Sequence, residues 1–154
     1  MKAYLVQHGE ATSKEVNPDR PLTDKGRSDV FKVAALIRPL ALQVGEIVHS
    51  GKARAAQTAE LLAEVIVSVG GVKARDGLAP NDPVEPLREE LNSVSQDIML
   101  VGHLPFLGKL AAALVTGSEE RNVVSFRQGG IVCLERSDDK RWAVAWMVTP
   151  DILK

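Results

Sequence analysis

Three short apolar runs in this chain each end at or near a histidine, and this repeated pattern limits the possible fold more than any other feature. The runs cover residues 3–6, 46–49 and 98–101 and are rich in Val, Ile and Leu. The histidines at their ends are His8, His49 and His103. Runs of this length and composition are typical of buried strands. We therefore predict strands whose carboxyl ends carry polar, reactive side chains.

Apolar residues at helical spacing follow each of these strands. The predicted helices cover residues 24–38, 54–66, 82–94 and 105–115. Thr23 is the expected N-cap of the first helix, and Asp82, before Pro83, that of the third. Residues 11–22 are polar and contain proline, so we expect a loop there. The pattern predicts alternation of strands and helices.

The end of the chain predicts a different arrangement. We predict a hairpin of two strands over residues 131–134 and 142–148, with Trp142 and Trp146 on one face. A further short strand is predicted over residues 72–74. Alternating strands and helices followed by a hairpin indicate an α/β fold. We expect three α/β/α layers, a mainly parallel sheet and an antiparallel edge.

Composition excludes several classes of protein. The 154 residues fit one domain, 45% of them are hydrophobic and 25% charged, as in ordinary globular proteins. A net charge of −1 gives no general attraction to nucleic acid. We see no signal peptide after Met1 and no apolar run of membrane-spanning length. The single cysteine, Cys133, suits a reducing cytoplasm.

The strand ends predict an anion site. Ligands of open α/β sheets bind at the carboxyl ends of the strands. Arg54 stands at the start of one predicted helix and Pro105 at the start of another, and helix N-termini favour anions. A lone histidine at a strand end is more often structural, but two imidazoles and a guanidinium on one rim predict an oxyanion or phosphate pocket. His49 is expected to be structural or at the rim of this pocket.

Four motifs resemble those of the histidine phosphatase superfamily. Residues 5–10, Leu-Val-Gln-His-Gly-Glu, resemble its Arg-His-Gly signature, and residues 20–26, Arg-Pro-Leu-Thr-Asp-Lys-Gly, its Arg-x-Leu-Thr-x-x-Gly segment. Residues 50–58 resemble its Ser-x-x-x-Arg-x-x-Gln-Thr motif, and residues 101–105 its second-histidine motif. The motifs stand in the family's order along the whole chain. The resemblance implies a phosphoglycerate mutase-like fold over residues 1–154, as a single domain without a large cap. The short length points to the small SixA-type phosphohistidine phosphatases.

The resemblance also implies a mechanism. His8 would be the nucleophile and form a phosphohistidine intermediate on the enzyme, with its other ring nitrogen held by a backbone carbonyl. Arg54 and His103 would bind the phosphoryl oxygens, with Gln7, Gly9 and Arg20 as further substrate-binding residues. The family needs no cofactor or metal, and no metal-ligand spacing occurs here. The implied partner is a phosphorylated protein, or else a small phosphate ester.

Gln7 departs from the family pattern, because it stands where the signature has arginine. Glutamine lacks the charge and the bidentate fork of a guanidinium. Its presence is expected to cost about 3 kcal/mol of transition-state stabilisation, or about a hundredfold in rate, unless another cation replaces it. The candidate replacements are Lys14, Arg20, Lys52 and Arg127.

The general acid stays open among three carboxyl groups. They belong to Asp82, Glu85 and Glu10. Asp82 has a competing explanation as a helix N-cap, which we favour.

Three functions are compatible with the sequence. The leading one is a phosphatase acting on phosphohistidine in a protein, and the second a phosphatase of a small phosphate ester. The third is a non-catalytic phosphate- or phosphohistidine-binding module, which Gln7 keeps open.

Overall fold

The computed structural model describes residues 1–154, and its central feature is a six-stranded sheet in the order β5-β3-β6-β1-β7-β8. The strands of this sheet are β1 (Lys2–Gln7), β3 (Glu46–His49), β5 (Val72–Ala74), β6 (Ile98–Gly102), β7 (Ile131–Arg136) and β8 (Trp142–Val148). Four of them, β5, β3, β6 and β1, are parallel. The strands β7 and β8 complete the sheet in antiparallel pairing. The predicted parallel sheet with an antiparallel edge is confirmed.

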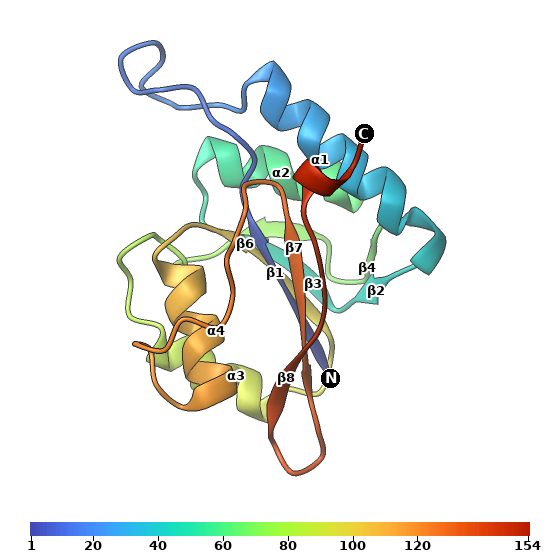
Figure 1. The fold of residues 1–154 in the computed structure, drawn as a ribbon, viewed down its shortest axis with the longest axis vertical. Helices are drawn as coiled ribbons and strands as arrows, with labels where there is room; N and C mark the ends of the chain where they lie inside the picture. The colour runs from blue at the N-terminus through green and yellow to red at the C-terminus, as the bar shows by residue number, and fades with distance from the viewer.

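Helices cover both faces of the sheet (Figure 1). They are α1 (Asp24–Ile37), α2 (Ala53–Ala63), α3 (Glu85–Ser93) and α4 (Phe106–Thr116), with short 3-10 helices η1 (Arg38–Leu40) and η2 (Pro150–Ile152). One apolar core lies between the sheet and α1 with α2, and a second between the sheet and α3 with α4. This is the expected three-layer α/β/α architecture.

Local signals explain where the helices begin and end. Thr23 caps α1 as predicted, since its hydroxyl accepts a hydrogen bond from the N–H of Gly26 at 3.0 Å. The helix α4 ends at Gly117, whose φ of 81° provides the left-handed C-cap. The predicted start of α3 at Asp82 is wrong. The Asp82 carboxylate accepts from the N–H of Ala79 instead, and the helix begins at Glu85.

Two further departures concern strand pairing. The second helix, α2, ends at Ala63, before the predicted end at residue 66, and Val67–Ser68 then form the unpredicted strand β4, which pairs with β2 (Gln43–Val44) in a separate two-stranded sheet. The prediction that Trp142 and Trp146 share one face is also wrong. An irregularity opposite Cys133 and Leu134 places one extra residue in β8, so Trp142 joins the α3–α4 core and Trp146 packs against the other.

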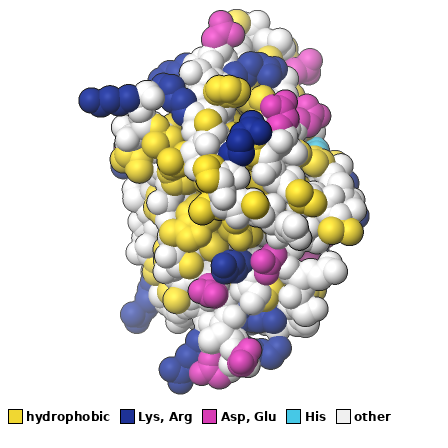
Figure 2. Space-filling model, turned by 90° about the vertical axis from the view of Figure 1, so that its right-hand side faces the viewer, with side chains coloured by type: hydrophobic (Ala, Val, Ile, Leu, Met, Phe, Trp, Pro, Cys, Tyr) yellow, Lys and Arg dark blue, Asp and Glu magenta, His cyan; other side chains and the backbone are white.

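The surface carries apolar side chains among charged ones. Figure 2 shows an apolar patch at the middle of one face, with charged side chains above and below it. The most exposed large apolar residues are Val69, 83% exposed, and Val16, 78% exposed. No helix is long and apolar enough to span a membrane.

Candidate active site

The three strands that end in histidines are neighbours in the sheet. The strand β6 lies between β1 and β3, so His8, His103 and His49 leave the sheet at the same edge. The register pairs Gln7 with Gly102, and the N–H of His8 donates to the carbonyl of Gly102 at 3.0 Å. These contacts align the carboxyl ends of β1 and β6. We call the residues Gln7, His8, Ser50, Arg54 and His103 the histidine edge.

His8 is buried and oriented through its backbone neighbour. Its side chain is 7% exposed, and Nδ1 lies 2.6 Å from the carbonyl oxygen of Gly9. A carbonyl only accepts, so Nδ1 carries the proton and Nε2 keeps its lone pair. Burial lowers the pKa of His8, and the positive charges of Arg54 and Arg20 lower it further, against the opposing effect of the Gly9 carbonyl. The imidazole is therefore neutral at pH 7 and has a nucleophilic nitrogen.

His103 faces His8 with 5.0 Å between the ring centroids. Its Nε2 is hydrogen-bonded to the hydroxyl of Ser50 at 2.6 Å, and its Nδ1 is buried without a partner. Burial is the main cause that lowers the pKa of His103 to about 3. The pKa is lowered further by repulsion between the two imidazoles when both are protonated, and by the positive charges of Arg54, Lys52 and Arg20. An anion placed among these groups would offset their repulsion and raise this pKa.

Arg54 enters the site from the first turn of α2. The N-cap of this helix, Lys52, makes no side-chain capping bond, so the first N–H groups of α2 have no side-chain acceptor. The Nε atom of Arg54 is buried without a hydrogen-bond partner. Burial lowers the pKa of Arg54, and Arg20 lowers it further. A cation held in this way is stabilised by an anionic ligand.

Arg20 reaches the same region from the loop before α1. Its backbone has a φ of 50°, and its Nε donates to the carbonyl of Thr12 at 3.1 Å, which leaves the other guanidinium nitrogens free. Its charge acts on both histidines and on Arg54. Of the possible replacements for the family arginine, Arg20 is thus close to the predicted nucleophile. Arg127 instead donates to the hydroxyl of Ser125 and the carbonyl of Phe126.

Gly9 has a packing role in this structure. Its N–H donates to the Thr58 hydroxyl at 3.0 Å, and a Cβ at this position would lie 3.0 Å from the carbonyl oxygen of Gly26. The Thr58 hydroxyl in turn donates to the carbonyl of Arg54 at 2.8 Å. Thr58 therefore ties the segment after His8 to the first turn of α2.

Unpartnered polar atoms concentrate at the histidine edge. Only three buried side-chain polar atoms in the chain lack a hydrogen-bond partner: Gln7 Oε1, Arg54 Nε and His103 Nδ1. Such atoms are costly to bury and are usually satisfied. Their presence on three predicted site residues indicates a place prepared for a polar ligand.

Arg54 of the histidine edge also lines a cationic cavity of about 690 Å³, whose lining does not include His8 or His103. Four cationic residues line it: Lys14, Arg20, Lys52 and Arg54. The only carboxylate in the lining belongs to Asp19. A cavity with this charge suits an anionic substrate.

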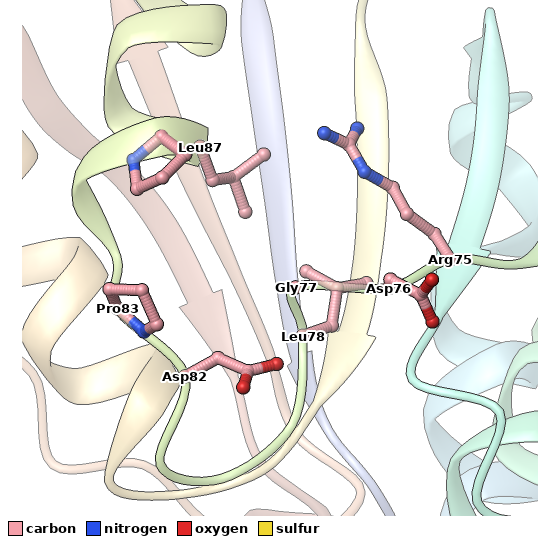
Figure 3. A pocket seen from close by; sticks show the side chains of 8 residues that line it. Arg75, Asp76, Gly77, Leu78, Asp82, Pro83 and Leu87 are labelled. Carbon is pink, nitrogen blue, oxygen red and sulfur yellow. The ribbon is translucent and has the colours of Figure 1, made fainter.

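None of the three candidate general acids lines this cavity. Asp82 lines a separate cavity together with Arg75 and Leu87 (Figure 3). Its carboxylate accepts a hydrogen bond from the N–H of Ala79. Glu85 forms an ion pair with Arg88.

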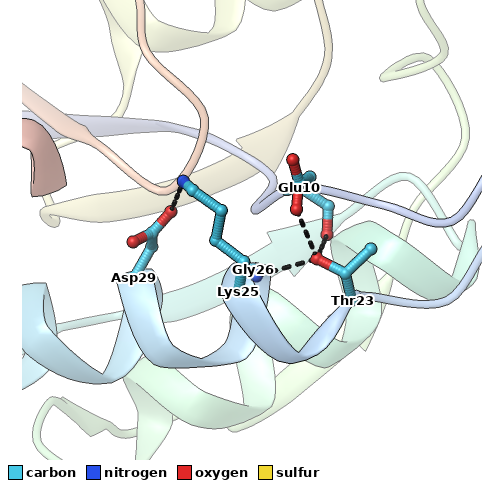
Figure 4. A network of polar contacts seen from close by, with 5 residues as sticks. All are labelled: Glu10, Thr23, Lys25, Gly26 and Asp29. Carbon is cyan, nitrogen blue, oxygen red and sulfur yellow. Dashed lines mark hydrogen bonds and ion pairs between the residues drawn. The ribbon is translucent and has the colours of Figure 1, made fainter.

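The third candidate, Glu10, belongs to the start of α1. Its carboxylate accepts from the hydroxyl of Thr23 at 2.7 Å, and Thr23 in turn caps the N–H of Gly26 (Figure 4). Beside this network Lys25 and Asp29 form an ion pair along the helix. Each of the three carboxyl groups thus has a structural partner.

Two residues of the site were not expected from the sequence. No role was predicted for Ser50 beyond its place in the motif, but its hydroxyl contacts His103. No role was predicted for Thr58 either, yet it links Gly9 to Arg54. Both are the terminal residues of the motif over 50–58, and that position was the available signal. No group of three or more His, Cys, Asp or Glu residues is arranged to hold a metal ion.

Comparison with known proteins identifies the family. The family model for the histidine phosphatase superfamily (branch 1) matches residues 3–79. An uncharacterized protein of Picosynechococcus is 31% identical over 141 residues, covering 87% of this chain and 84% of its own. The phosphohistidine phosphatase SixA of Escherichia coli is 21% identical, covering 100% of this chain and 97% of its own.

Solved structures share the fold. The protein histidine phosphatase SixA, complexed with tungstate, matches with a TM-score of 0.86 at 22% identity over 100% of both chains. A mycobacterial glucosyl-3-phosphoglycerate phosphatase matches with a TM-score of 0.68 at 17% identity, covering 94% of this chain and 97% of its own. The architecture is therefore the phosphoglycerate mutase-like α/β fold of SixA. Together with the family model and the relative at 31% identity, these findings show that the chain belongs to the histidine phosphatase superfamily.

Proposed function

We propose that this protein is a phosphatase that removes the phosphoryl group from phosphohistidine in a partner protein. Membership of the histidine phosphatase superfamily supports phosphatase activity. The observation that carries the proposal is the pair of unpartnered buried nitrogens, Arg54 Nε and His103 Nδ1, on residues beside His8. The oxygens of a phosphoryl group can accept the hydrogen bonds for which Arg54 and His103 have no partner in the structure. The protein acts as one domain over residues 1–154, without a large cap.

His8 is the proposed nucleophile. Its Nε2 lone pair attacks phosphorus, and the bond from phosphorus to the substrate imidazole breaks with its electron pair going to that nitrogen. A water molecule then attacks the phosphorus on His8, the bond to Nε2 breaks, and inorganic phosphate leaves. Arg54 and His103 hold the equatorial oxygens in both steps.

The leaving group favours phosphohistidine over a phosphate ester. An alkoxide must receive a proton as it departs, which normally requires a positioned acid. A phosphoimidazole can instead be protonated by water on its second ring nitrogen before the bond breaks, because that nitrogen titrates near neutral pH. The carboxyl groups of Glu10, Asp82 and Glu85 have structural partners, which is consistent with a substrate that needs no carboxylic acid.

Arg20 is the proposed replacement for the family arginine at position 7. Its guanidinium has free nitrogens, and its charge acts on His8. Gln7 contributes at most a neutral hydrogen bond, so turnover is slower than with an arginine at this position. The cytoplasmic location expected from the lone cysteine stays a prediction; Cys133 itself is buried.

The deciding experiment follows phosphate release from a phosphohistidine-bearing carrier protein. Wild type is compared with His8→Ala, Gln7→Arg and, as a matched histidine control, His49→Gln. We expect no turnover and no acid-labile phosphoenzyme with His8→Ala, faster turnover with Gln7→Arg, and most of the activity in the control. His49 is a suitable control because it is buried at the same edge but accepts a hydrogen bond from the N–H of Gly51.

Two outcomes would replace the proposal. No turnover by wild type, recovered in Gln7→Arg, identifies a binding module for phosphohistidine. Faster release from a small phosphate ester such as a sugar phosphate than from the carrier identifies an ester phosphatase. The fold similarity to glucosyl-3-phosphoglycerate phosphatase makes the second comparison worth including.

A further inference from the structure

The cationic cavity beside the histidine edge has more positive charge than a phosphoryl group requires. Arg20 and Arg54 lie closest to the predicted reaction centre, and each lowers the pKa of His8. Two guanidinium groups match the charge of about −2 that a phosphoryl group carries. Lys14 and Lys52, which line the same cavity, remain unassigned.

These two lysines have no carboxylate partner within the chain. The five ion pairs of the molecule all lie elsewhere, and they join Lys25 to Asp29, Lys73 to Glu46, Arg75 to Glu90, Arg88 to Glu85 and Arg141 to Asp139. Lys14 and Lys52 line the cavity from two different segments, one from the loop over 11–22 and the other from the N-cap of α2. They therefore offer two positive charges beyond the phosphoryl position.

We propose that Lys14 and Lys52 form a docking site for carboxylates that flank the phosphohistidine of an acidic partner protein. This inference rests on the proposed function, because it names the substrate class of the same site. Carboxylates next to the modified histidine would lie over the mouth of the cavity when the phosphoryl group reaches His8. Opposite charges at such a rim increase specificity and the rate of association.

Exposed apolar side chains on both sides of the site favour a protein as the occupant. Val16, next but one to Lys14, is 78% exposed on the loop that projects from the body of the molecule (Figure 1). Leu104, directly after His103, is 41% exposed. Apolar residues exposed beside a polar site are typical of protein contacts. A small phosphorylated metabolite would leave both of them in water.

The test uses short peptides that carry a non-hydrolysable phosphonate analogue of phosphohistidine. One peptide has Asp and Glu on both sides of the analogue, and its matched partner has Asn and Gln. We expect wild type to bind the acidic peptide about fivefold more tightly at low salt, the magnitude of two exposed ion pairs. The preference should fall to less than twofold in the double variant K14Q/K52Q, and it should decrease with added salt.

A charge-matched control separates docking from net charge. Lys109 and Arg121 are exposed and do not line the cationic cavity, so the double variant K109Q/R121Q removes the same two positive charges elsewhere and should keep the fivefold preference. Equal binding of the two peptides by wild type would overturn the inference, and so would a preference that survives in K14Q/K52Q. Because binding is measured without turnover, either result is distinguishable from failure of the phosphatase proposal.

Discussion

Buried polar groups at the carboxyl ends of the central strands lack hydrogen-bond partners, whereas the carboxylates at the amino ends are all paired. At the carboxyl ends, Gln7, Arg54 and His103 each bury a polar atom without a partner beside a cationic cavity. At the amino ends lies a second cavity, of about 410 Å³, lined by the carboxylates of Glu46, Glu90 and Asp97. Each of these three carboxylates has a partner, and the partners are Lys73, Arg75 and the backbone N–H of Lys2.

This contrast separates stabilising polar groups from groups kept for a ligand. A paired carboxylate contributes to stability, whereas a buried donor without a partner costs about 1–3 kcal/mol. A fold tolerates that cost where a bound group will satisfy the atoms. Changes at the carboxyl ends should therefore affect activity more than stability, and changes at the amino ends the reverse.

The largest expected effect follows from Arg54→Gln. Loss of a guanidinium that stabilises the transferring phosphoryl group should lower kcat/KM for a phosphohistidine substrate by about a hundredfold or more. The free energy of unfolding should stay equal or rise, because the variant removes a partly buried cation whose buried Nε has no hydrogen-bond partner. Steady-state kinetics and urea denaturation measure the two quantities. A large loss of stability with little loss of rate would contradict the view that Arg54 serves a ligand and not the stability of the fold.

Acid should destabilise the protein through the histidine edge. Burial and nearby cations lower the pKa of His103 to about 3 in the folded protein, against about 6.5 in the unfolded chain. Between these values the unfolded chain binds the additional proton, so stability is present above pH 6.5 and falls as the pH decreases towards 3. The contribution is up to about 1.4 kcal/mol for each pH unit.

His103→Gln isolates this contribution from those of the other histidines. Urea denaturation at pH 7, 6 and 5 should give a smaller acid-induced loss of stability in the variant than in wild type. Saturating vanadate should also reduce the loss in wild type, because a bound oxyanion raises the pKa of His103. Parallel curves for the two proteins would contradict the assignment.

A smaller effect is expected from Ser50→Ala. The hydroxyl holds the Nε2 side of the His103 ring, so its loss should let the ring turn and lower kcat by about tenfold, with KM less affected. The acidic limb of the pH–rate profile should shift as well, and Ser50→Thr should restore most of the rate. A simple rise in KM with an unchanged pH profile would instead indicate a role in substrate binding.

Much of the site could be predicted because it depends on local patterns. The apolar runs before His8 and His103 specify buried strands, and parallel strands bring their carboxyl ends to one edge, so the two histidines were expected to meet. The cap at Thr23 was equally local, since the hydroxyl and the N–H of Gly26 lie three residues apart. Such features require no knowledge of distant packing.

The missed features depend on contacts between distant segments. Ser50 follows β3 and His103 follows the neighbouring strand β6, so their contact depends on the pairing of these strands. Nothing in the residues near Ser50 specifies this contact. The extra residue in β8 depends on its pairing with β7, so alternation within β8 alone placed Trp146 on the wrong face. The Asp82 carboxylate could accept a hydrogen bond either from the first turn of a helix or from a preceding turn. In the folded protein it accepts from the N–H of Ala79 in the turn.

The smallest effect is expected from Arg75→Gln, because Arg75 pairs with Glu90, a carboxylate of the cavity at the amino ends. This change removes a bidentate ion pair with Glu90, with distances of 2.6 and 3.0 Å, but both side chains are about one third exposed. Solvent screening limits such a pair to about 0.5–1 kcal/mol, so Tm should fall by only a few degrees. The value of kcat/KM should equal that of wild type, because Arg75 contacts no residue of the histidine edge. Arg75→Gln is thus the matched counterpart of Arg54→Gln: the same substitution should change stability where the arginine has a carboxylate partner and catalysis where its Nε has none. If Arg75→Gln lowers the rate while Arg54→Gln does not, the reaction centre does not lie beside Arg54.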